Sequence, residues 1–449
     1  MKKIFKLIII LSLVQNSNAQ CPSGNVGFTT QTELNTFLIE YPNCTTLTNL
    51  AIGGIDENDP IIDLSPLSNL TYVNDLEISF TGLSSLAGFH NLTEVGELSI
   101  GFNNQLESLE GLESLNTLYD LEIISNAELA NLDGLNNLVS SDLGDISMFI
   151  ADNPELISLS ALSGLTSTWD LGITDNNSLT SLNGFENLQS IGGDLIISGN
   201  NSLTSLQQLI NVDNELGYVS ILGNDSLTSL EGLNNIQIID WLYVAGNAQL
   251  QNLDALSELQ QVDKIIVSNT PLETIEPLQN LQSVNQISIS DNDFLETISF
   301  PLITNLNILV LSNNPNLPNL NGFSSLESIR HLSLSGLNNL TTLAGLQNLE
   351  EIYSEDSSGY LTIRFMSSLT SLEPLSNLSK IGGYIYLDNN ENLESLQTLE
   401  NVDITEVNHL EITNNASLSY CHNPNVCDYL SNFGNHRLIE NNLGSCINV

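Results

Sequence analysis

The feature that most constrains this chain is a repeat that recurs almost from end to end. Sixteen units can be aligned, and their spacings run from 22 to 29 residues, mostly 22 to 25. Self-similarity at such a period is typical of architectures in which each coil stacks on its neighbours. The 449 residues therefore predict one stack of coils rather than several globular domains. The units begin at residues 49, 75, 97, 120, 147, 170, 194, 218, 241, 264, 286, 308, 331, 360, 384 and 409.

Each unit opens with a short alternating stretch. In the unit that begins at residue 194, Leu195 and Ile197 point one way while Asp194, Ile196 and Ser198 point the other. This periodicity predicts a strand with one buried face. Two shorter apolar pairs follow, separated by Gly, Asn, Ser and Asp, which favour turns. No unit holds an amphipathic run of ten residues, so we expect about three short strands per coil, joined by tight corners.

An asparagine recurs six residues after the start of eleven units. An amide side chain can bond to backbone groups at a turn and stack on the same amide of the next coil. We therefore expect these residues to hold the coils together rather than to bind a ligand. They are Asn103, Asn126, Asn153, Asn176, Asn200, Asn224, Asn247, Asn292, Asn314, Asn390 and Asn415.

The two ends of the repeat array carry helix signals. Thr30 and Glu33 have the spacing of a capping box, and Pro42 predicts the end of the helix that they open. Near the other end, Asn423 and Pro424 predict the start of a second short helix. Such caps would cover the raw ends of a stack. The predicted layout is a leader at 1–20, an N-terminal cap at 21–48, repeats at 49–420 and a C-terminal cap at 421–449.

The first twenty residues predict a secretory signal peptide. Lys2, Lys3 and Lys6 precede the apolar run 4–14, and a small residue, Ala19, lies next to the expected cleavage site near residue 20. No other segment is apolar and long enough to span a membrane. We therefore expect the protein to be secreted or held at the cell surface.

The five cysteines lie only near the two ends of the mature chain, and export predicts disulfides there. Cys21 and Cys44 form the expected N-terminal pair. Cys446 pairs with Cys421 or Cys427, and the sequence does not distinguish these alternatives.

The charge balance restricts the partners. Eight basic residues stand against 53 acidic ones, giving a net charge of −45. Nucleic acids and anionic membranes are therefore excluded as expected partners. Divalent cations are a further candidate at the acidic loops 56–59 and 354–357, although neither has the spacing of a known calcium loop.

The motif 191–206, Ile-Gly-Gly-Asp-Leu-Ile-Ile-Ser-Gly-Asn-Asn-Ser-Leu-Thr-Ser-Leu, resembles the receptor L domain, and a similar motif occurs at 381–390. Over residues 21–449 the chain resembles secreted bacterial leucine-rich-repeat proteins with L-domain-like coils. This resemblance implies an all-β, right-handed leucine-rich solenoid of about sixteen coils with a short helical cap at each end. It also implies recognition or adhesion as the usual role.

The outward positions of the first strand of each coil would form one continuous face. Its N-terminal third is acidic, and its C-terminal part carries Tyr, Trp and His. Rows of exposed aromatic rings suit sugars and protein hot spots. The candidate ligand-binding residues are Tyr218, Trp241 and Tyr243 as one group, and Tyr360, Tyr384 and Tyr386 as a second.

Enzyme signatures such as G-x-S-x-G, H-E-x-x-H and a P-loop are missing from the sequence, and we expect no catalytic activity, cofactor or metal centre. The leading prediction is an extracellular recognition or adhesion module for a protein or carbohydrate ligand. The alternatives are a structural matrix or spacer protein without a specific ligand and, ranked last, a calcium-dependent β-helix enzyme acting on polysaccharides.

Overall fold

The spacing of the leucines sets the path of each coil. In the coil that begins at Asp120, a buried leucine recurs at every third residue from Leu129 to Leu138. The amide of Leu135 donates to the carbonyl of Leu132 at 3.1 Å, and the amide of Leu138 to that of Leu135 at 3.0 Å. Bonds that span three residues are those of the 3₁₀ turn. In a chain of successive 3₁₀ turns, leucines that are three residues apart therefore all point toward the core.

The expectation of about three strands per coil is wrong for this reason. A period of three fits 3₁₀ turns, whereas a strand needs a period of two. Each coil has one long strand, and the rest consists of turns, single β-bridges and short 3₁₀ helices. The 3₁₀ helices are Ser65–Leu67, Ser160–Leu162, Gln207–Leu209, Asp254–Leu256, Glu276–Asn280, Asn321–Phe323, Glu373–Leu375 and Gln397–Asn401.

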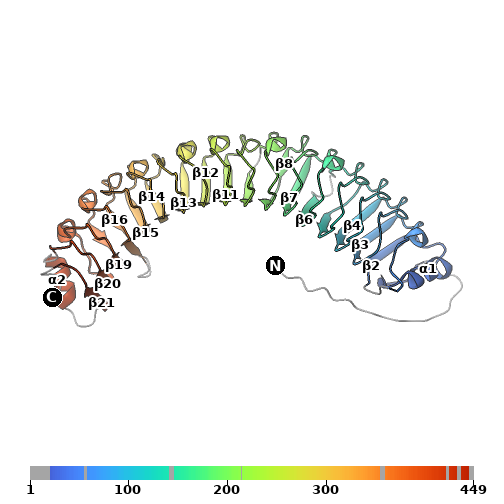
Figure 1. The fold of residues 1–449 in the computed structure, drawn as a ribbon, viewed down its shortest axis with the longest axis horizontal. Coiled ribbons are helices and arrows are strands. Elements are labelled where there is room, and N and C mark those ends of the chain that lie inside the picture. The colour runs from blue at the N-terminus through green and yellow to red at the C-terminus, as the bar shows by residue number, and fades with distance from the viewer. Residues whose placement is uncertain are drawn as a thin grey trace. The chain divides into compact units, whose positions relative to one another are not determined.

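The structure is a computed structural model that describes residues 21–54, 58–140, 146–213, 215–353, 359–420, 424–431 and 436–443. It divides into two compact units, Met1–Asp194 with Gly199–Leu203, and Leu195–Ser198 with Thr204–Val449. In each unit the long strands lie side by side and the connecting turns lie on the other side of the coils (Figure 1). The long parallel sheet, with only two α-helices among the described residues and a core of spaced leucines, confirms the predicted leucine-rich β-solenoid.

The first unit has one helix and a parallel sheet. The strands pair in chain order from β1 to β8, each with the strand before it. The elements are β1 (Asn25–Phe28), α1 (Gln31–Glu40), β2 (Thr46–Ile52), β3 (Tyr72–Ser79), β4 (Glu94–Gly101), β5 (Asp120–Ile124), β6 (Ile146–Ala151), β7 (Ser167–Thr174) and β8 (Ser190–Ile191).

The second unit repeats this arrangement. Its strands also pair in parallel. The short strand β16 precedes β17 in the same row of the sheet, and β18 precedes β19 in the same way. The elements are β9 (Leu195–Ser198), β10 (Leu216–Leu222), β11 (Ile238–Ala245), β12 (Gln261–Ser268), β13 (Ser283–Ser290), β14 (Asn305–Ser312), β15 (Ser328–Ser335), β16 (Glu351–Ile352), β17 (Tyr360–Arg364), β18 (Lys380–Ile381), β19 (Gly383–Asp388), β20 (Val407–Thr413), α2 (Pro424–Ser431) and β21 (His436–Glu440).

Both predicted helices are present, and each end also contributes a strand. The Thr30 hydroxyl accepts the amide of Glu33, which confirms the N-cap, and α2 begins at Pro424. Strand β1 pairs with β2, and β21 pairs with β20, so the sheet starts before and ends after the sixteen predicted units. The two extra strands escaped prediction because the sequences around them lack the spaced leucines of a full coil.

The predicted asparagine ladder is confirmed, since all eleven side chains are fully buried. The Asn126 Nδ2 atom donates to the carbonyls of Ile100, in the coil before, and Ile124, in its own coil. Its Oδ1 atom accepts the amide of Asn103 at 3.1 Å, and its own amide donates to Asn153 Oδ1 at 3.0 Å. Each amide group thus satisfies backbone groups of neighbouring coils, which fixes the coils in register.

The predicted disulfide between Cys21 and Cys44 is present, and Cys427 is a free thiol within the described part of the chain. Cys421 and Cys446, on which the C-terminal pairing depends, lie outside the described residues. The predicted signal peptide 1–20, residues 56 and 57 of the first acidic loop and the whole of the second loop lie outside them as well. Across the described segments, no helix is long and apolar enough to cross a membrane.

Replacing Asn126 by alanine tests the ladder. The change leaves the amide of Asn103 and the carbonyl of Ile100 without their partner in the core. An unsatisfied buried polar group costs about 1–3 kcal/mol, so we expect a loss of free energy of unfolding of at least that size. Urea denaturation followed by circular dichroism measures it. The matched control is Asn104→Ala, at an exposed neighbouring position, and equal stability of the two variants would contradict the role of the ladder.

Candidate ligand-binding face

The long strands carry side chains of two kinds. On β11, Leu242 and Val244 are buried, while Trp241 and Tyr243 point outward. Trp241 and Tyr243 are the first and third residues of their repeat unit. We call the outward residues at these two positions of the units, together with their register partners on the strands at the ends, the strand face. Strand register places equivalent positions opposite each other on neighbouring strands, about 4.8 Å apart. Any side chain that recurs at one of these positions therefore forms a row.

The first predicted group, Tyr218, Trp241 and Tyr243, lies on β10 and β11. Tyr218 and Trp241 are register partners, and their rings meet edge to face with centroids 6.3 Å apart. The indole of Trp241 is 49% exposed, and the ammonium of Lys264 on β12 lies 5.0 Å from its ring centroid. On β10 to β12 the strand face therefore combines exposed aromatic surface with one of the few cations of the protein.

The second predicted group, Tyr360, Tyr384 and Tyr386, lies on β17 and β19. Tyr360 and Tyr384 are register partners, and the rings of Tyr384 and Tyr386 stack at 6.1 Å. All three residues are half-buried, so part of each is accessible to solvent.

Three histidines extend the second group into a longer row. His331 stacks on Tyr360 with centroids 4.3 Å apart, and His409 lies 5.2 Å from Tyr386 and 6.3 Å from Tyr384. His436 of β21 stacks on His409 at 6.3 Å. We call the row His331, Tyr360, Tyr384, His409 and His436, with Tyr386 beside it, the aromatic ladder.

Sequence reasoning found only part of this ladder. His331 and His409 fall on the predicted face, but they were not included among the predicted ligand-binding residues. His436 lies in a segment that was predicted to be a cap, because nothing in its sequence continues the leucine repeat. One signal in the sequence could have found His331 and His409. Both lie at the first position of a repeat unit, and a tyrosine lies at the same position of the next or the preceding unit.

The two predicted groups do not meet. Strands β12 to β15 lie between them, and their third positions carry Ile266, Ser288, Val310 and Ser333. The structure therefore brings together the members of each group, on the same face, but leaves two separate aromatic patches.

The surroundings of Tyr360 and Tyr386 raise the pKa of both phenols. Burial raises the pKa of Tyr360. Burial also raises the pKa of Tyr386, and the negative charge of nearby Glu411 adds to the rise, against a smaller opposing effect of Arg364. Glu411 also lies 3.6 Å from Nε2 of His409. At neutral pH the ladder therefore presents hydroxyl donors beside a carboxylate acceptor.

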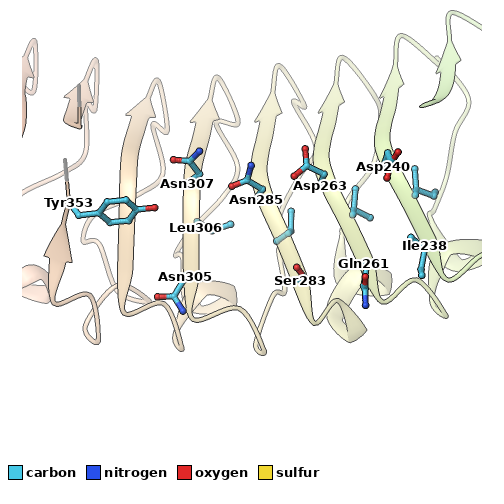
Figure 2. Close-up of a pocket in the computed structure, with 13 residues that line it drawn as sticks. Ile238, Asp240, Gln261, Asp263, Ser283, Asn285, Asn305, Leu306, Asn307 and Tyr353 are labelled. Atoms are coloured by element: carbon cyan, nitrogen blue, oxygen red, sulfur yellow. The ribbon is translucent and has the colours of Figure 1, made fainter. Parts of the chain in front are cut away.

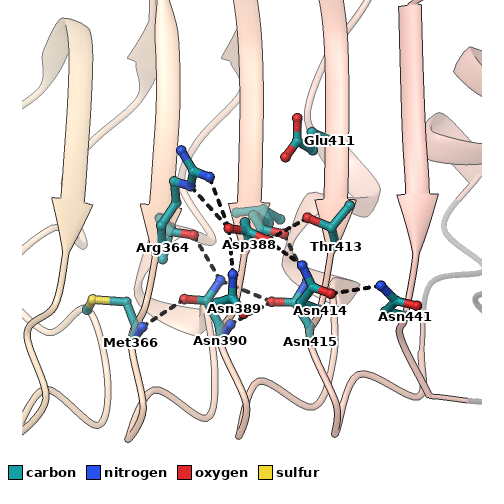
Figure 3. Close-up of polar contacts among 12 residues, drawn as sticks. Arg364, Met366, Asp388, Asn389, Asn390, Glu411, Thr413, Asn414, Asn415 and Asn441 are labelled. Carbon is teal, nitrogen blue, oxygen red and sulfur yellow. Dashed lines mark hydrogen bonds and ion pairs between the residues drawn. The ribbon is translucent and has the colours of Figure 1, made fainter.

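A charged cluster fixes the strands that carry the ladder. Asp388, at the end of β19, accepts hydrogen bonds from Thr413 Oγ1 at 2.6 Å and Asn414 Nδ2 at 2.9 Å (Figure 3). Its other oxygen accepts from Asn389 Nδ2 at 2.8 Å and forms an ion pair with Arg364 at 3.0 Å. This buried carboxylate joins the ends of β17, β19 and β20, so Tyr360, Tyr384 and His409 are held on strands with a common anchor.

In the first unit the strand face is acidic, as predicted. Asp75, Glu97 and Asp120 are register partners on β3, β4 and β5. Burial raises the pKa of Glu77 on the same face, and repulsion from Asp75 and Glu122 acts in the same direction, against a hydrogen bond with Ser79. The described residues contain no group of three or more His, Cys, Asp or Glu side chains arranged to hold a metal ion.

Comparison with known proteins identifies no family for this chain. No protein-family model matches it, and no curated protein is significantly similar to it. Solved structures match it only distantly. A leucine-rich repeat protein from Bacteroides eggerthii is 12% identical, covers 92% of this chain and 77% of its own, and gives a TM-score of 0.32.

Two further structures are similarly distant. The internalin InlF of Listeria monocytogenes is 14% identical over 84% of this chain and 80% of its own, with a TM-score of 0.25. The TLR13 chain of a TLR13–ssRNA13 complex is 15% identical over 86% and 73%, with a TM-score of 0.23. Similarities at this level carry no information about a ligand.

The anchor at Asp388 predicts a specific pH dependence. Burial alone would raise the pKa of this carboxyl, but hydrogen bonds from Thr413, Asn414, Asn389 and Arg364 outweigh it and lower the pKa from 3.8 to about 2. A lowered pKa in the folded state stabilises the protein above the unfolded-state value, and the stabilisation is lost as the pH falls from about 4 to about 2. We expect Asp388→Asn to be less stable than wild type at pH 6 and to lose less stability over that interval.

Urea midpoints measured between pH 2 and pH 6 check this expectation. Asp133→Asn, at an exposed position, is the control for the general effect of removing one carboxylate. A stability profile of Asp388→Asn that runs parallel to that of wild type would refute the anchoring role.

Proposed function

We propose that this protein is an extracellular recognition module that binds a protein or glycan ligand through its strand face, with the aromatic ladder as the principal contact. The observation that carries the proposal is the alignment of these rings along one face. His331 stacks on Tyr360, and a second run of ring contacts joins Tyr384, His409 and His436. Strand register places Tyr360 opposite Tyr384, so the two runs lie in one row. A protein that served only as a spacer would have no need for such a row of accessible rings on one face.

The chemistry of the ladder suits recognition. Tyrosine offers a rigid apolar ring with a polar tip, so it gives a large contact area at a small cost in side-chain entropy. Stacked rings also restrict one another, which keeps the surface organised before the ligand arrives. The faces of such rings pack against sugar rings or against apolar side chains, and the hydroxyl and imidazole groups add hydrogen bonds.

The charge of the protein further narrows the classes of ligand that can bind. With 53 acidic residues against eight basic ones, the protein repels anionic partners over its surface. Next to the ladder, the carboxyl group of Glu411 lies beside His409 and Tyr386. A neutral or basic ligand is therefore favoured over a nucleic acid or an acidic polymer.

An extracellular location agrees with the same observations. The disulfide between Cys21 and Cys44 belongs in an oxidising compartment. The basic and then apolar start of the chain supports export by a signal peptide.

Screening the mature chain against glycan and protein arrays tests this proposal. For the ligand that binds most tightly, we expect Tyr384→Ala to weaken binding by about tenfold or more, because truncation of a central aromatic contact costs more than about 1 kcal/mol. Isothermal titration calorimetry measures the change in Kd.

The matched control is Tyr420→Ala, which removes an exposed tyrosine that is not part of the strand face. Circular dichroism verifies that both variants remain folded. An absence of binding on both arrays, or equal effects of the two substitutions, would rule out the ladder as the recognition site.

A further inference from the structure

A second feature of the strand side is that β11 to β14 each carry two adjacent outward residues. On β12, Val262 and Ile265 are buried, and the two residues between them, Asp263 and Lys264, both point outward. The pairing of β12 with β13 runs from Val262 directly to Lys264 and skips Asp263. The pairing of β11 with β12 makes the same skip, so the additional outward residues form a row of their own beside the strand face.

This row lines a groove of about 400 Å³ that crosses β11 to β14. Asp240, Asp263, Asn285 and Asn307 follow one another along it, one from each strand (Figure 2). Tyr353 lies at the Asn307 end, with its hydroxyl directed along the row (Figure 2). A volume of this size falls within the range of small-ligand sites, roughly 300–1,000 Å³.

The polar side chains of the row are available to a ligand. Surface asparagines elsewhere in this unit are used to hold the coils together: Asn280 and Asn316 each donate to a carbonyl of the preceding coil at 2.8 Å. Within the described residues, by contrast, the side chains of Asp240, Asp263, Asn285 and Asn307 form no hydrogen bond or ion pair with the protein. Their donors and acceptors therefore face the groove with only solvent as a partner.

The accessible surface of the groove is mainly polar. Val284 and Leu306 are almost completely buried beneath the row, and Ile238 is half-buried at one end. Regularly spaced amides and carboxylates with a tyrosine ring at one end suit a ligand that is rich in hydroxyl groups.

The arrangement also disfavours two other kinds of extended ligand, an added β-strand and an anionic polymer. The backbone of β11 to β14 is already paired in the parallel sheet, so a peptide that lies across these strands cannot add to the sheet as a further strand. Two carboxylates at one end of the row oppose an anionic polymer. The amides and carboxylates recur about every 4.8 Å, which suits a chain of repeating hydroxyl-bearing rings.

We infer that this groove binds a neutral, extended oligosaccharide, with successive sugar units contacting Asp240, Asp263, Asn285 and Asn307 and the last unit reaching Tyr353. The groove is a site apart from the aromatic ladder, and binding there does not depend on what the ladder binds. Because the two sites use different residues, each can be tested with its own substitutions.

Titration of the full mature chain with linear neutral hexasaccharides tests the inference. The probes are β-1,4-glucan, β-1,3-glucan, β-1,4-mannan and β-1,4-xylan hexamers, with hexagalacturonate as the anionic comparison and an extended uncharged hexapeptide as the peptide comparison. We expect at least one neutral hexamer to bind and both comparison ligands to bind at least tenfold more weakly. The double variant Asn285→Ala/Asn307→Ala should weaken binding of that hexamer at least tenfold.

Two controls separate the groove from the rest of the face. Ser290→Ala/Ser312→Ala removes outward polar groups from the same two strands outside the groove, and should leave the Kd unchanged. Tyr384→Ala/His409→Ala disrupts the ladder and should also leave it unchanged. The inference is overturned if none of the neutral hexamers binds, if a comparison ligand binds as tightly, or if the groove variant binds like wild type. Loss of binding only in the ladder variant would overturn it while leaving the proposed recognition function intact.

Discussion

The buried asparagine ladder is the interaction on which the rest of this structure depends. An amide such as that of Asn126 bonds to carbonyls of its own coil and of the coil before, and accepts the backbone amide of Asn103. Because these groups lie in the core, a shift of one coil by a single residue would leave several of them unsatisfied. Strand register follows from this constraint, and register is what turns one outward residue per coil into a row.

The same backbone then supports different surfaces. Residues at equivalent positions are acidic on β3 to β5, small or polar on β13, and aromatic on β15, β17, β19, β20 and β21. None of these choices affects the leucines beneath, since from the first position of each unit onward outward residues alternate with buried ones. The protein can therefore vary its outward side chains freely while the core remains that of one repeat. The cluster at Asp388 is an exception, because there a charged side chain becomes part of the framework that carries the ladder.

Much of the framework could be predicted from the sequence. The spacing of leucines, the recurring asparagine and the capping signals at Thr30 and Pro424 all correspond to what the structure contains. Each is a local pattern with a direct physical meaning. The number of strands per coil was not predicted correctly, because a period of three was interpreted as short strands when it indicates 3₁₀ turns.

The candidate sites were harder to predict, for a different reason. Residues on successive strands are 22 to 29 positions apart in the chain and become neighbours only through register. The tyrosines were found because they lie at expected outward positions, whereas His436 lies in a strand that carries no repeat signal. The groove was missed because it depends on the skipped pairing at Asp263, and nothing in the composition of a strand reveals where its pairing skips a residue.

Hydroxyl-radical footprinting of the mature chain, alone and with its ligand bound, tests the central claim most directly. The method reports the solvent exposure of individual Tyr, Trp and His side chains without any substitution. The strand-face account predicts that the ligand protects Tyr384, Tyr386 and His409, while Trp169 and Tyr420, which are exposed outside the strand face, keep their reactivity. Protection of Trp169 or Tyr420, with the ladder left fully reactive, would contradict it.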